Sequence, residues 1–458
     1  MSARANSNAA RDIAYHIHPH TSFAQHEETG SLVITRGDGV YVYDDQGTRY
    51  LEAMAGLWCA SLGFSEKRLA EAAYRQMLEL PYYHTFSYKT HTPVIELAER
   101  LVELAPGHMS KVIFQSSGSE ATDTAVKFVH YYNNAIGRPE KKKIISRMRA
   151  YHGTTRTAAS LTGLPNMHAL FDLPLPGILH TLCPHHYRNA EPGESEEAFA
   201  SRCARALDDL IEAEGPETVG AFIAEPVMGA GGVIVPPPTY YEKVQAVLRK
   251  HDVLFIADEV ICGFGRTGRM WGSETLGIDP DILVCAKALS SSYLPISAVL
   301  IRDPIYQGLK AGTEQMPFGH GFTYGGHPVS AAVAVETLKI YEEIDIVAHA
   351  GKIGARLQAG LREFADHPLV GEVRGAGMVA AVELVEDKAT GKAFEPARKV
   401  GLVFQDRAEE DGLIVRAMGD SIALSPPLIL DEAQTDELLE RFGRALDRTW
   451  RGVESGQI

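Results

Sequence analysis

The sequence predicts an α/β protein in which a large domain with a mostly parallel central sheet is followed by a smaller α+β domain. Between about residues 110 and 300, short apolar runs bounded by turn residues alternate with helical stretches. These runs are apolar at successive positions, as is typical of strands buried on both faces. Beyond about residue 330, long helical patterns flank two strand-like segments, 378–384 and 413–416.

The individual elements follow from the same patterns in chain order. Residues 1–35 show little periodicity and are expected to form an arm. Short strands are expected at Val40–Val42 and Tyr50–Leu51, on either side of a turn at Asp45–Gly47. Helices are expected at about 66–79 and 92–104, and strands of the large sheet at Val112–Phe114, Ile144–Ile145, Val219–Ala224, Val253–Ala257, Ile282–Cys285 and Ile296–Ile301.

These elements divide the 458-residue chain into three parts. Residues 1–60 would form an N-terminal arm and part of the small domain. Residues 61–330 would form the large, ligand-binding domain, and residues 331–458 the C-terminal small domain.

Composition narrows the class of partner and the compartment. The net charge is -15, which argues against nucleic acid or an anionic membrane as the main partner. No apolar run reaches the roughly 18 residues of a membrane span, and Met1–Arg11 lacks the apolar core of a signal peptide. The five cysteines are scattered and form no C-x-x-C, so we expect a reducing compartment, the cytoplasm.

Charged residues stand at the ends of two apolar runs. Asp258 and Glu259 follow the run that starts at Val253, and Lys287 follows the run after Asp281. Strand alternation points Asp258 and Glu259 to opposite faces, so only one of them is expected in a given site. Ligands of an open α/β sheet bind outside the carboxyl ends of its strands, where Asp258 and Lys287 could meet. Taken alone, Asp258 is more simply interpreted as a helix cap or ion-pair partner, and Lys287 as a surface lysine.

The chemistry of such a pair is nevertheless distinctive. A lysine in a desolvated pocket loses proton affinity and becomes a nucleophile for carbonyl groups. Pyridoxal phosphate (PLP) needs this amine, and it also needs a carboxylate at its ring nitrogen, because the protonated ring is the better electron sink.

A phosphate-binding turn would complete such a site. Ser117, Gly118 and Ser119 follow a strand and open a helical stretch at Ala121–Tyr131, where free backbone N–H groups and the helix dipole favour an anion. An ordinary helix cap explains the same residues equally well. Tyr151, which follows another strand, could lie over a flat ring or simply be packed.

In combination, these features resemble the class III aminotransferases, a fold-type-I PLP-dependent family that includes the amine and ω-amino acid:pyruvate transaminases. The resemblance covers nearly the whole chain. The matching stretches are Ser117-Gly-Ser-Glu-Ala121, Tyr151-His-Gly153, Ala224-Glu-Pro-Val-Met-Gly-Ala-Gly-Gly232, Ile256-Ala-Asp-Glu-Val-Ile-Cys-Gly-Phe-Gly-Arg-Thr-Gly268, Ala286-Lys287 and Gly321-Phe-Thr323.

The resemblance implies a role for each residue around the cofactor. Lys287 would hold PLP covalently and shuttle the α-proton, and Asp258 would pair with the ring nitrogen. Val260 and Tyr151 would cover the two ring faces, and His152 is also expected at the cofactor.

The resemblance also implies that one chain does not complete the site. Ser117, Gly118 and Ser119 are expected at the phosphate, together with a Thr323 that comes from the neighbouring subunit. Glu225 would lie behind the cofactor. A homodimer is therefore expected, and the resemblance leaves a tetramer open.

The substrate side departs from part of the family. Ornithine and 4-aminobutyrate transaminases carry Gln-Gly-Glu after the Glu-Pro motif, where the glutamate neutralises an active-site arginine. Here the stretch is Val227-Met-Gly-Ala230, so Ala230 replaces the acid, which argues against those two substrates.

An apolar substrate pocket is expected instead. Leu57, Trp58 and Phe86 would line it with Tyr151, although Trp58 and Phe86 could be ordinary core aromatics. By resemblance, Arg416 would bind the keto acid carboxylate and move aside for an apolar amine.

Arg416 could instead be structural and paired with Asp420.

Two other signals are set aside. Gly263-Phe-Gly-Arg-Thr-Gly268 matches G-x-G-x-x-G, but no helix pattern follows it, so a dinucleotide site is not expected. His16, His18 and His20 alternate, and Cys183 precedes His185-His186, but neither group has the spacing of a zinc site. No metal is therefore expected.

The predicted function is an aminotransferase. It would move an amino group from an amine or ω-amino acid to a keto acid, with pyruvate as the expected acceptor, by ping-pong exchange between PLP and its amine form (PMP). Two alternatives stay open at this stage: a related PLP enzyme such as an aminomutase or racemase, and a cofactor-free α/β binding protein.

Overall fold

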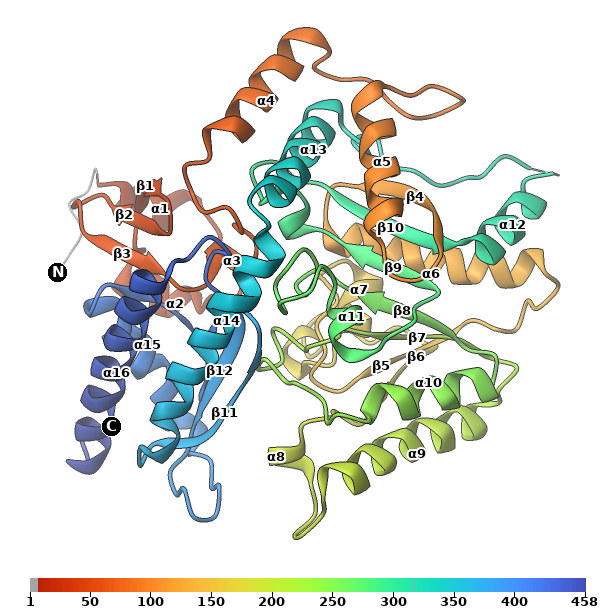
Figure 1. Ribbon diagram of the computed structural model, residues 1–458. Coiled ribbons are helices and arrows are strands. Elements are labelled where there is room, and N and C mark those ends of the chain that lie inside the picture. The colour runs from red at the N-terminus through yellow and green to blue at the C-terminus, as the bar shows by residue number, and fades with distance from the viewer. Residues whose placement is uncertain (1–6, 315) are drawn as a thin grey trace.

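The computed structural model describes residues 7–314 and 316–458, whose strands form three sheets (Figure 1). The largest has seven strands in the order β4-β10-β9-β8-β7-β5-β6. β10 is antiparallel to both of its neighbours, and every other pair is parallel, which confirms the mostly parallel sheet. Its strands are β4 (Met109–Gln115), β5 (Lys143–Arg147), β6 (Ile178–Thr181), β7 (Val219–Ala224), β8 (Leu254–Asp258), β9 (Ile282–Cys285) and β10 (Ser297–Arg302).

Helices cover both faces of this sheet, which is why its strands are apolar throughout. In β7, Phe222 and Ala224 face one cluster with α9 (Glu196–Glu214) and α10 (Tyr240–Lys250). Ala221 and Ile223 face the opposite cluster, with α6 (Gly118–Ala135) and α12 (Asp303–Gly312). The three-layer arrangement leaves the carboxyl ends of the strands as the place for a site.

Two four-stranded sheets lie on the side of the molecule that carries α1 (Asn8–Tyr15) and α16 (Glu432–Glu454) (Figure 1). β13 pairs in parallel with β3, so a strand from before residue 60 joins one from after residue 330. The strands are β1 (Ile34–Asp38), β2 (Tyr41–Asp44), β3 (Arg49–Glu52) and β13 (Leu413–Ile414) in one sheet, and β11 (Val370–Ala376), β12 (Val379–Leu384), β14 (Arg416–Met418) and β15 (Ser421–Leu424) in the other. The predicted domain boundaries at residues 60 and 330 stay predictions.

The expected helices at 66–79 and 92–104 are confirmed as α4 and α5. The remaining helices are α1 (Asn8–Tyr15), α2 (Phe23–Thr29), α3 (Ala55–Trp58), α4 (Lys67–Glu79), α5 (Thr92–Leu104), α7 (Arg156–Leu161), α8 (His186–Asn189), α11 (Gly272–Leu276), α13 (Pro328–Glu343), α14 (Ile346–Arg362), α15 (Val400–Glu410) and α16 (Glu432–Glu454), with a 3-10 turn η2 (Lys287–Ser290) after β9. Within the described ranges, no helix combines the length and the apolar character needed to cross a membrane.

The structure differs from the expected elements at three points. The arm, expected from its lack of periodicity, contains α1 and α2, which Ser7 and Ser22 cap by accepting backbone hydrogen bonds. Leu413–Arg416 is not one strand: it contributes to β13 and to β14, which belong to different sheets. Strands β1, β6, β11 and β15 were not predicted.

The alternating arm histidines have a structural partner. His16 and His18 lie 3.0 and 2.7 Å from the carboxylate oxygens of Asp12, and His26 contacts the same carboxylate at 3.4 Å. These contacts hold α1 and the segment that follows it against α2. His20 is not part of the group and lies instead at a cavity described below.

A buried glutamate in β3 makes stability depend on pH. Burial raises the pKa of Glu52 to about 8, and its carboxylate accepts a 2.6 Å hydrogen bond from the N–H of Gly56. Because the unfolded chain loses this proton at lower pH than the folded chain, stability falls as pH rises from the ordinary glutamate range towards 8.

We therefore expect Glu52→Gln to raise the melting temperature at pH 8 more than at pH 5, since glutamine keeps the acceptor without the charge. Thermal unfolding at both pH values checks this. The exposed Glu71→Gln in α4 is the control and should show no such difference. An equal effect of Glu52→Gln at both pH values would contradict the explanation.

Candidate active site

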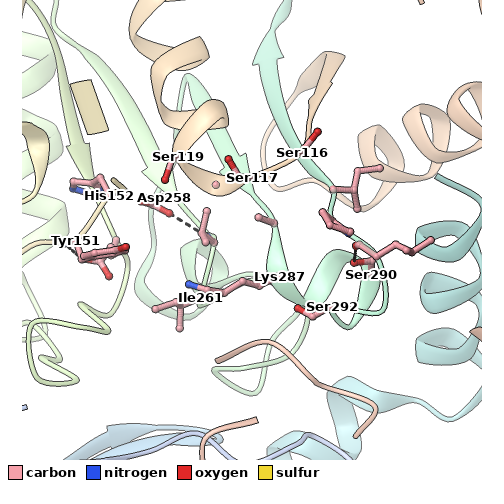
Figure 2. A pocket seen from close by; sticks show the side chains of 18 residues that line it. Ser116, Ser117, Ser119, Tyr151, His152, Asp258, Ile261, Lys287, Ser290 and Ser292 are labelled. Carbon is pink, nitrogen blue, oxygen red and sulfur yellow. Dashed lines mark hydrogen bonds and ion pairs between the residues drawn. The ribbon is translucent and has the colours of Figure 1, made fainter. Parts of the chain in front are cut away.

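A cavity of about 340 Å³ opens at the carboxyl ends of the parallel strands. Its wall is built from the residues that directly follow five of them, as Figure 2 shows in part. Ser116 to Ser119 follow β4, Tyr151 to Gly153 follow β5, Glu225 follows β7, Asp258 and Val260 end and follow β8, and Lys287 follows β9. We call this the first cavity.

Asp258 is fixed by two donors. His152 Nδ1 lies 2.7 Å from its Oδ2, and the N–H of Val260 donates to Oδ1 at 3.1 Å. Both side chains are almost completely buried, so the carboxylate keeps hydrogen-bond partners in place of water. The position of His152 beside Asp258 gives it an orienting role that the resemblance did not specify.

Glu259 points the other way, as strand alternation predicted. Its carboxylate accepts hydrogen bonds from the N–H groups of Gly272 and Ser273, at 3.0 and 2.6 Å, and from the Ser273 hydroxyl. Glu259 therefore anchors α11 and does not line the first cavity.

Lys287 projects into the first cavity, with its Nζ directed towards the side that holds Tyr151, His152 and Asp258 (Figure 2). Burial lowers its pKa, while Asp258 opposes the shift. A larger fraction of neutral amine results, which is the form that attacks a carbonyl or accepts a proton.

The first turn of α6 supplies the anion-binding end of the cavity. The Ser117 hydroxyl accepts the N–H of Glu120, and the Glu120 carboxylate accepts the N–H groups of Ser116 and Ser117, so the ordinary helix cap is present. Within the described residues, the N–H groups of Gly118 and Ser119 have no partner. Cap and anion site therefore coexist, and Ser117 serves the cap.

Close packing also shapes this end. A Cβ on Gly118 would lie 3.3 Å from both methyl groups of Val260, so a larger residue would push the β8 turn away. The Ser119 hydroxyl accepts the N–H of Thr154 at 3.0 Å, which leaves its proton free to donate into the cavity.

Glu225 acts as a clamp on the backbone. Its two carboxylate oxygens accept the N–H groups of Tyr151, at 3.0 Å, and of Gly229, at 2.8 Å. Burial raises its pKa. The bonds hold Tyr151 and the loop that carries Ala230 in fixed positions.

A second cavity of about 490 Å³ meets the first at Lys287, Tyr151 and Ile261, which line both. The second cavity brings together four of the predicted substrate residues: Leu57, Trp58, Ala230 and Arg416.

The expected apolar character of this wall is only partly correct. His20, Arg149 and Asn166 also line it, and sequence reasoning missed all three. Their positions depend on contacts between distant segments: Arg149 Nη2, for example, donates to the carbonyl of Gly231 at 2.7 Å. Arg149 lies two residues before Tyr151, and this closeness in the sequence was the signal that could have placed it near the site.

Arg416 is not paired with Asp420. The Asp420 carboxylate accepts the N–H of Gly401 at 3.0 Å instead. In the described residues, no carboxylate lies within ion-pair distance of Arg416. Burial lowers its pKa, and Tyr151 partly offsets this. The guanidinium is thus available to a ligand.

Two predicted site residues lie elsewhere. Thr323 is exposed and outside both cavities, and its carbonyl accepts the Tyr82 hydroxyl at 2.8 Å. Phe86 packs against Gly321, with 42% of its surface exposed. One chain therefore does not bring Phe86 or Thr323 to Lys287, so their roles stay predictions that require a second chain.

Comparison with known proteins identifies the family. The family model "Aminotransferase class-III" matches residues 22–446. The chain is a class III aminotransferase. It is 53% identical to gamma aminobutyrate transaminase 3 of Solanum lycopersicum, over 92% of this chain and 82% of the relative, and 51% identical to vanillin aminotransferase of Capsicum frutescens, over 92% and 93%.

Solved structures agree with this assignment. An omega transaminase from Pseudomonas jessenii in complex with PMP is 58% identical, covers 98% of this chain with all of its own length, and has a TM-score of 0.97. An engineered omega transaminase variant for the synthesis of bulky amines is 57% identical, covers 98% of this chain with all of its own length, and has a TM-score of 0.96. The aminotransferase therefore has the fold-type-I architecture.

Class III aminotransferases use PLP, and the first cavity fits this group. The cavity carries a buried lysine amine, a carboxylate held by His152, and unpartnered N–H groups at the start of an 18-residue helix. These groups match the aldehyde, the ring nitrogen and the phosphate of the cofactor. Val260 and Tyr151 also line the first cavity, where they would face the ring.

Proposed function

We propose that this aminotransferase takes the amino group of a primary amine or ω-amino acid and passes it to pyruvate, in two half-reactions at one site. The observation that carries the proposal is the second cavity, which joins Lys287 to Leu57, Trp58 and an unpaired Arg416. Apolar contacts suit the carbon chain of an amine, and the guanidinium suits the carboxylate of a keto acid.

The residues of the chain divide the work. When bound, PLP supplies an electron sink for the carbon that carries the amino group. Lys287, whose pKa is lowered by burial, would accept the proton from that carbon at Nζ and donate it again. Asp258, held by His152, would hold the ring nitrogen, and Arg416 would orient the carboxylate of the acceptor.

The absence of a glutamate at Ala230 no longer argues strongly against 4-aminobutyrate. Three plant relatives, 49–53% identical to this chain, are named gamma aminobutyrate transaminases. Ala230 leaves Arg416 without an acidic neighbour in the second cavity, so the site can accept a carboxylate in either half-reaction. 4-Aminobutyrate is therefore retained beside simple amines as a candidate donor.

We further propose a homodimer in which Thr323 of one chain completes the first cavity of the other. The segment 82–88, whose Tyr82 hydroxyl donates to the Thr323 carbonyl, and Tyr324 carry exposed aromatic side chains, which a second copy would cover. They are Tyr82, Tyr83, Phe86, Tyr88 and Tyr324, with 38 to 108% of their surface exposed.

The cytoplasm is proposed as the compartment. All five cysteines are free, and four of them are buried, as suits a reducing environment. Cell fractionation with an antibody to the native chain would test this, and recovery with an organelle would contradict it.

A single half-reaction tests the proposed function. Cofactor-loaded enzyme mixed with an amine alone should release about one equivalent of the carbonyl product and change the cofactor absorbance, and pyruvate should reverse that change. Alanine, β-alanine, 4-aminobutyrate and 1-phenylethylamine form the donor panel. Lys287→Ala is the inactive control. Substrate turnover without any released carbonyl product would instead indicate an aminomutase or racemase.

Mixing two inactive variants tests the shared site. Lys287→Ala removes the amine, and Thr323→Asp repels a phosphate. If Thr323 acts across the interface, unfolding and refolding the two together should restore about a quarter of wild-type activity, because half of the random dimers hold one intact site. The control pair, Lys287→Ala with Asp258→Ala, should restore none. No recovery with the first pair would contradict the shared site.

A further inference from the structure

Arg149 carries a charge that the protein does not neutralise. Its Nε and Nη2 donate to the carbonyl of Gly231, at 3.0 and 2.7 Å, and no carboxylate of the described residues lies within ion-pair distance. A carbonyl oxygen orients a guanidinium but does not cancel its charge. The side chain lines the second cavity, together with Lys287 and Arg416.

A neighbouring arginine shows what a purely structural role looks like here. Arg374 binds the carbonyl of Gly232, the next residue along, at 2.9 and 2.6 Å. It also pairs with Glu372 at 2.6 Å and with Glu383. Arg374 is thus neutralised and Arg149 is not, although the same loop anchors both.

The whole second cavity has the same imbalance. Among residues 7–314 and 316–458, none that lines this cavity is acidic, although the chain has 59 acidic and 44 basic residues. Two arginines therefore face one cavity without a counter-charge. Partly buried charges in this position are stabilised when an anion binds between or beside them.

The backbone holds Arg149 in place at a cost. Its φ is 68°, a left-handed conformation that costs a side-chain-bearing residue about 1 kcal/mol or more. The N–H of Arg149 donates to the carbonyl of Gly163 at 2.8 Å, and the N–H of Gly163 donates to Ala150 at 2.8 Å. A Cβ on Gly163 would lie 2.2 Å from the Arg147 carbonyl, so only glycine allows this contact.

We propose that Arg149 binds the terminal carboxylate of a straight-chain ω-amino acid while the amino end of that donor lies at Lys287. The inference rests on the proposed function and deepens it. Arg416 binds the carboxylate of the keto acid, which is next to the reacting carbon. A second arginine in the same cavity can bind a carboxylate that lies at a different distance from the reacting carbon. The favoured donors are therefore amines with a distal carboxylate, such as 4-aminobutyrate.

Two matched donors measure this preference. 4-Aminobutyrate and n-butylamine differ only by a carboxylate in place of the terminal methyl group. The wild-type enzyme should have the larger kcat/KM for 4-aminobutyrate. In Arg149→Met, the ratio of the two kcat/KM values should fall at least about tenfold, because the methionine keeps the apolar stem and removes the charge.

Two control variants separate charge from folding. In Arg149→Lys, the ratio of the two kcat/KM values should fall less than in Arg149→Met, because lysine keeps the charge but loses the forked geometry. Met148→Leu, at the exposed neighbouring position, should leave the ratio unchanged. Calorimetric binding of butyrate, which cannot react, gives a readout independent of turnover and should weaken by a similar factor in Arg149→Met.

The outcomes separate a failure of the proposed function from a failure of the role given to Arg149. If the wild-type enzyme turns over neither these two donors nor any donor of the panel above, the proposed function fails, and this inference fails with it. If it turns over another donor but does not prefer 4-aminobutyrate to n-butylamine, the proposed function stands and this inference is overturned. If it turns over both donors but Arg149→Met leaves the ratio and butyrate binding unchanged, the proposed function stands and the role of Arg149 is overturned. If Arg149→Met does not fold, Arg149→Lys decides. A ratio of the two kcat/KM values in Arg149→Lys equal to that of the wild-type enzyme would count against the inference.

Discussion

The site depends on how a buried carboxylate is satisfied at the end of a strand. Asp258 has lost almost all contact with water, so its oxygens need donors from the protein. His152, which follows β5, provides one, and the N–H of Val260, in the turn after β8, provides the other. The bond from His152 ties together the loops after two strands that are separated by β7 in the sheet. The same loops place Tyr151 and Val260 in the wall of the first cavity, beside Lys287.

The parallel topology explains why so much chemistry collects in one place. Residues from five parallel strands reach the first cavity only because all of these strands end at the same edge. β10, the antiparallel strand, starts at this edge, and the segment before it, Leu294 to Ile296, closes the cavity on that side. Helices on both faces exclude water from the sheet and leave this edge as the entrance.

Residues adjacent to strands were predictable, and residues placed by distant contacts were not. Asp258 and Lys287 follow apolar runs, and the alternation of Asp258 with Glu259 was enough to separate their roles. Arg149 lies near Tyr151 in the sequence, but its side chain is held at the second cavity by hydrogen bonds to a loop 82 residues later. β6 was missed for a similar reason, since it pairs only with β5 at the sheet edge. Phe86 and Thr323 were named from a resemblance, and a single chain leaves both outside the cavities.

The central claim is that the first cavity holds the cofactor between Asp258 and the start of α6. A crystal structure of the PLP-loaded enzyme tests it most directly. The ring nitrogen should lie within hydrogen-bond distance of Asp258, and the phosphate within hydrogen-bond distance of the N–H groups of Gly118 and Ser119. Lys287 Nζ should be bonded to the cofactor. A phosphate held elsewhere, or a ring nitrogen without a carboxylate partner, would contradict the claim.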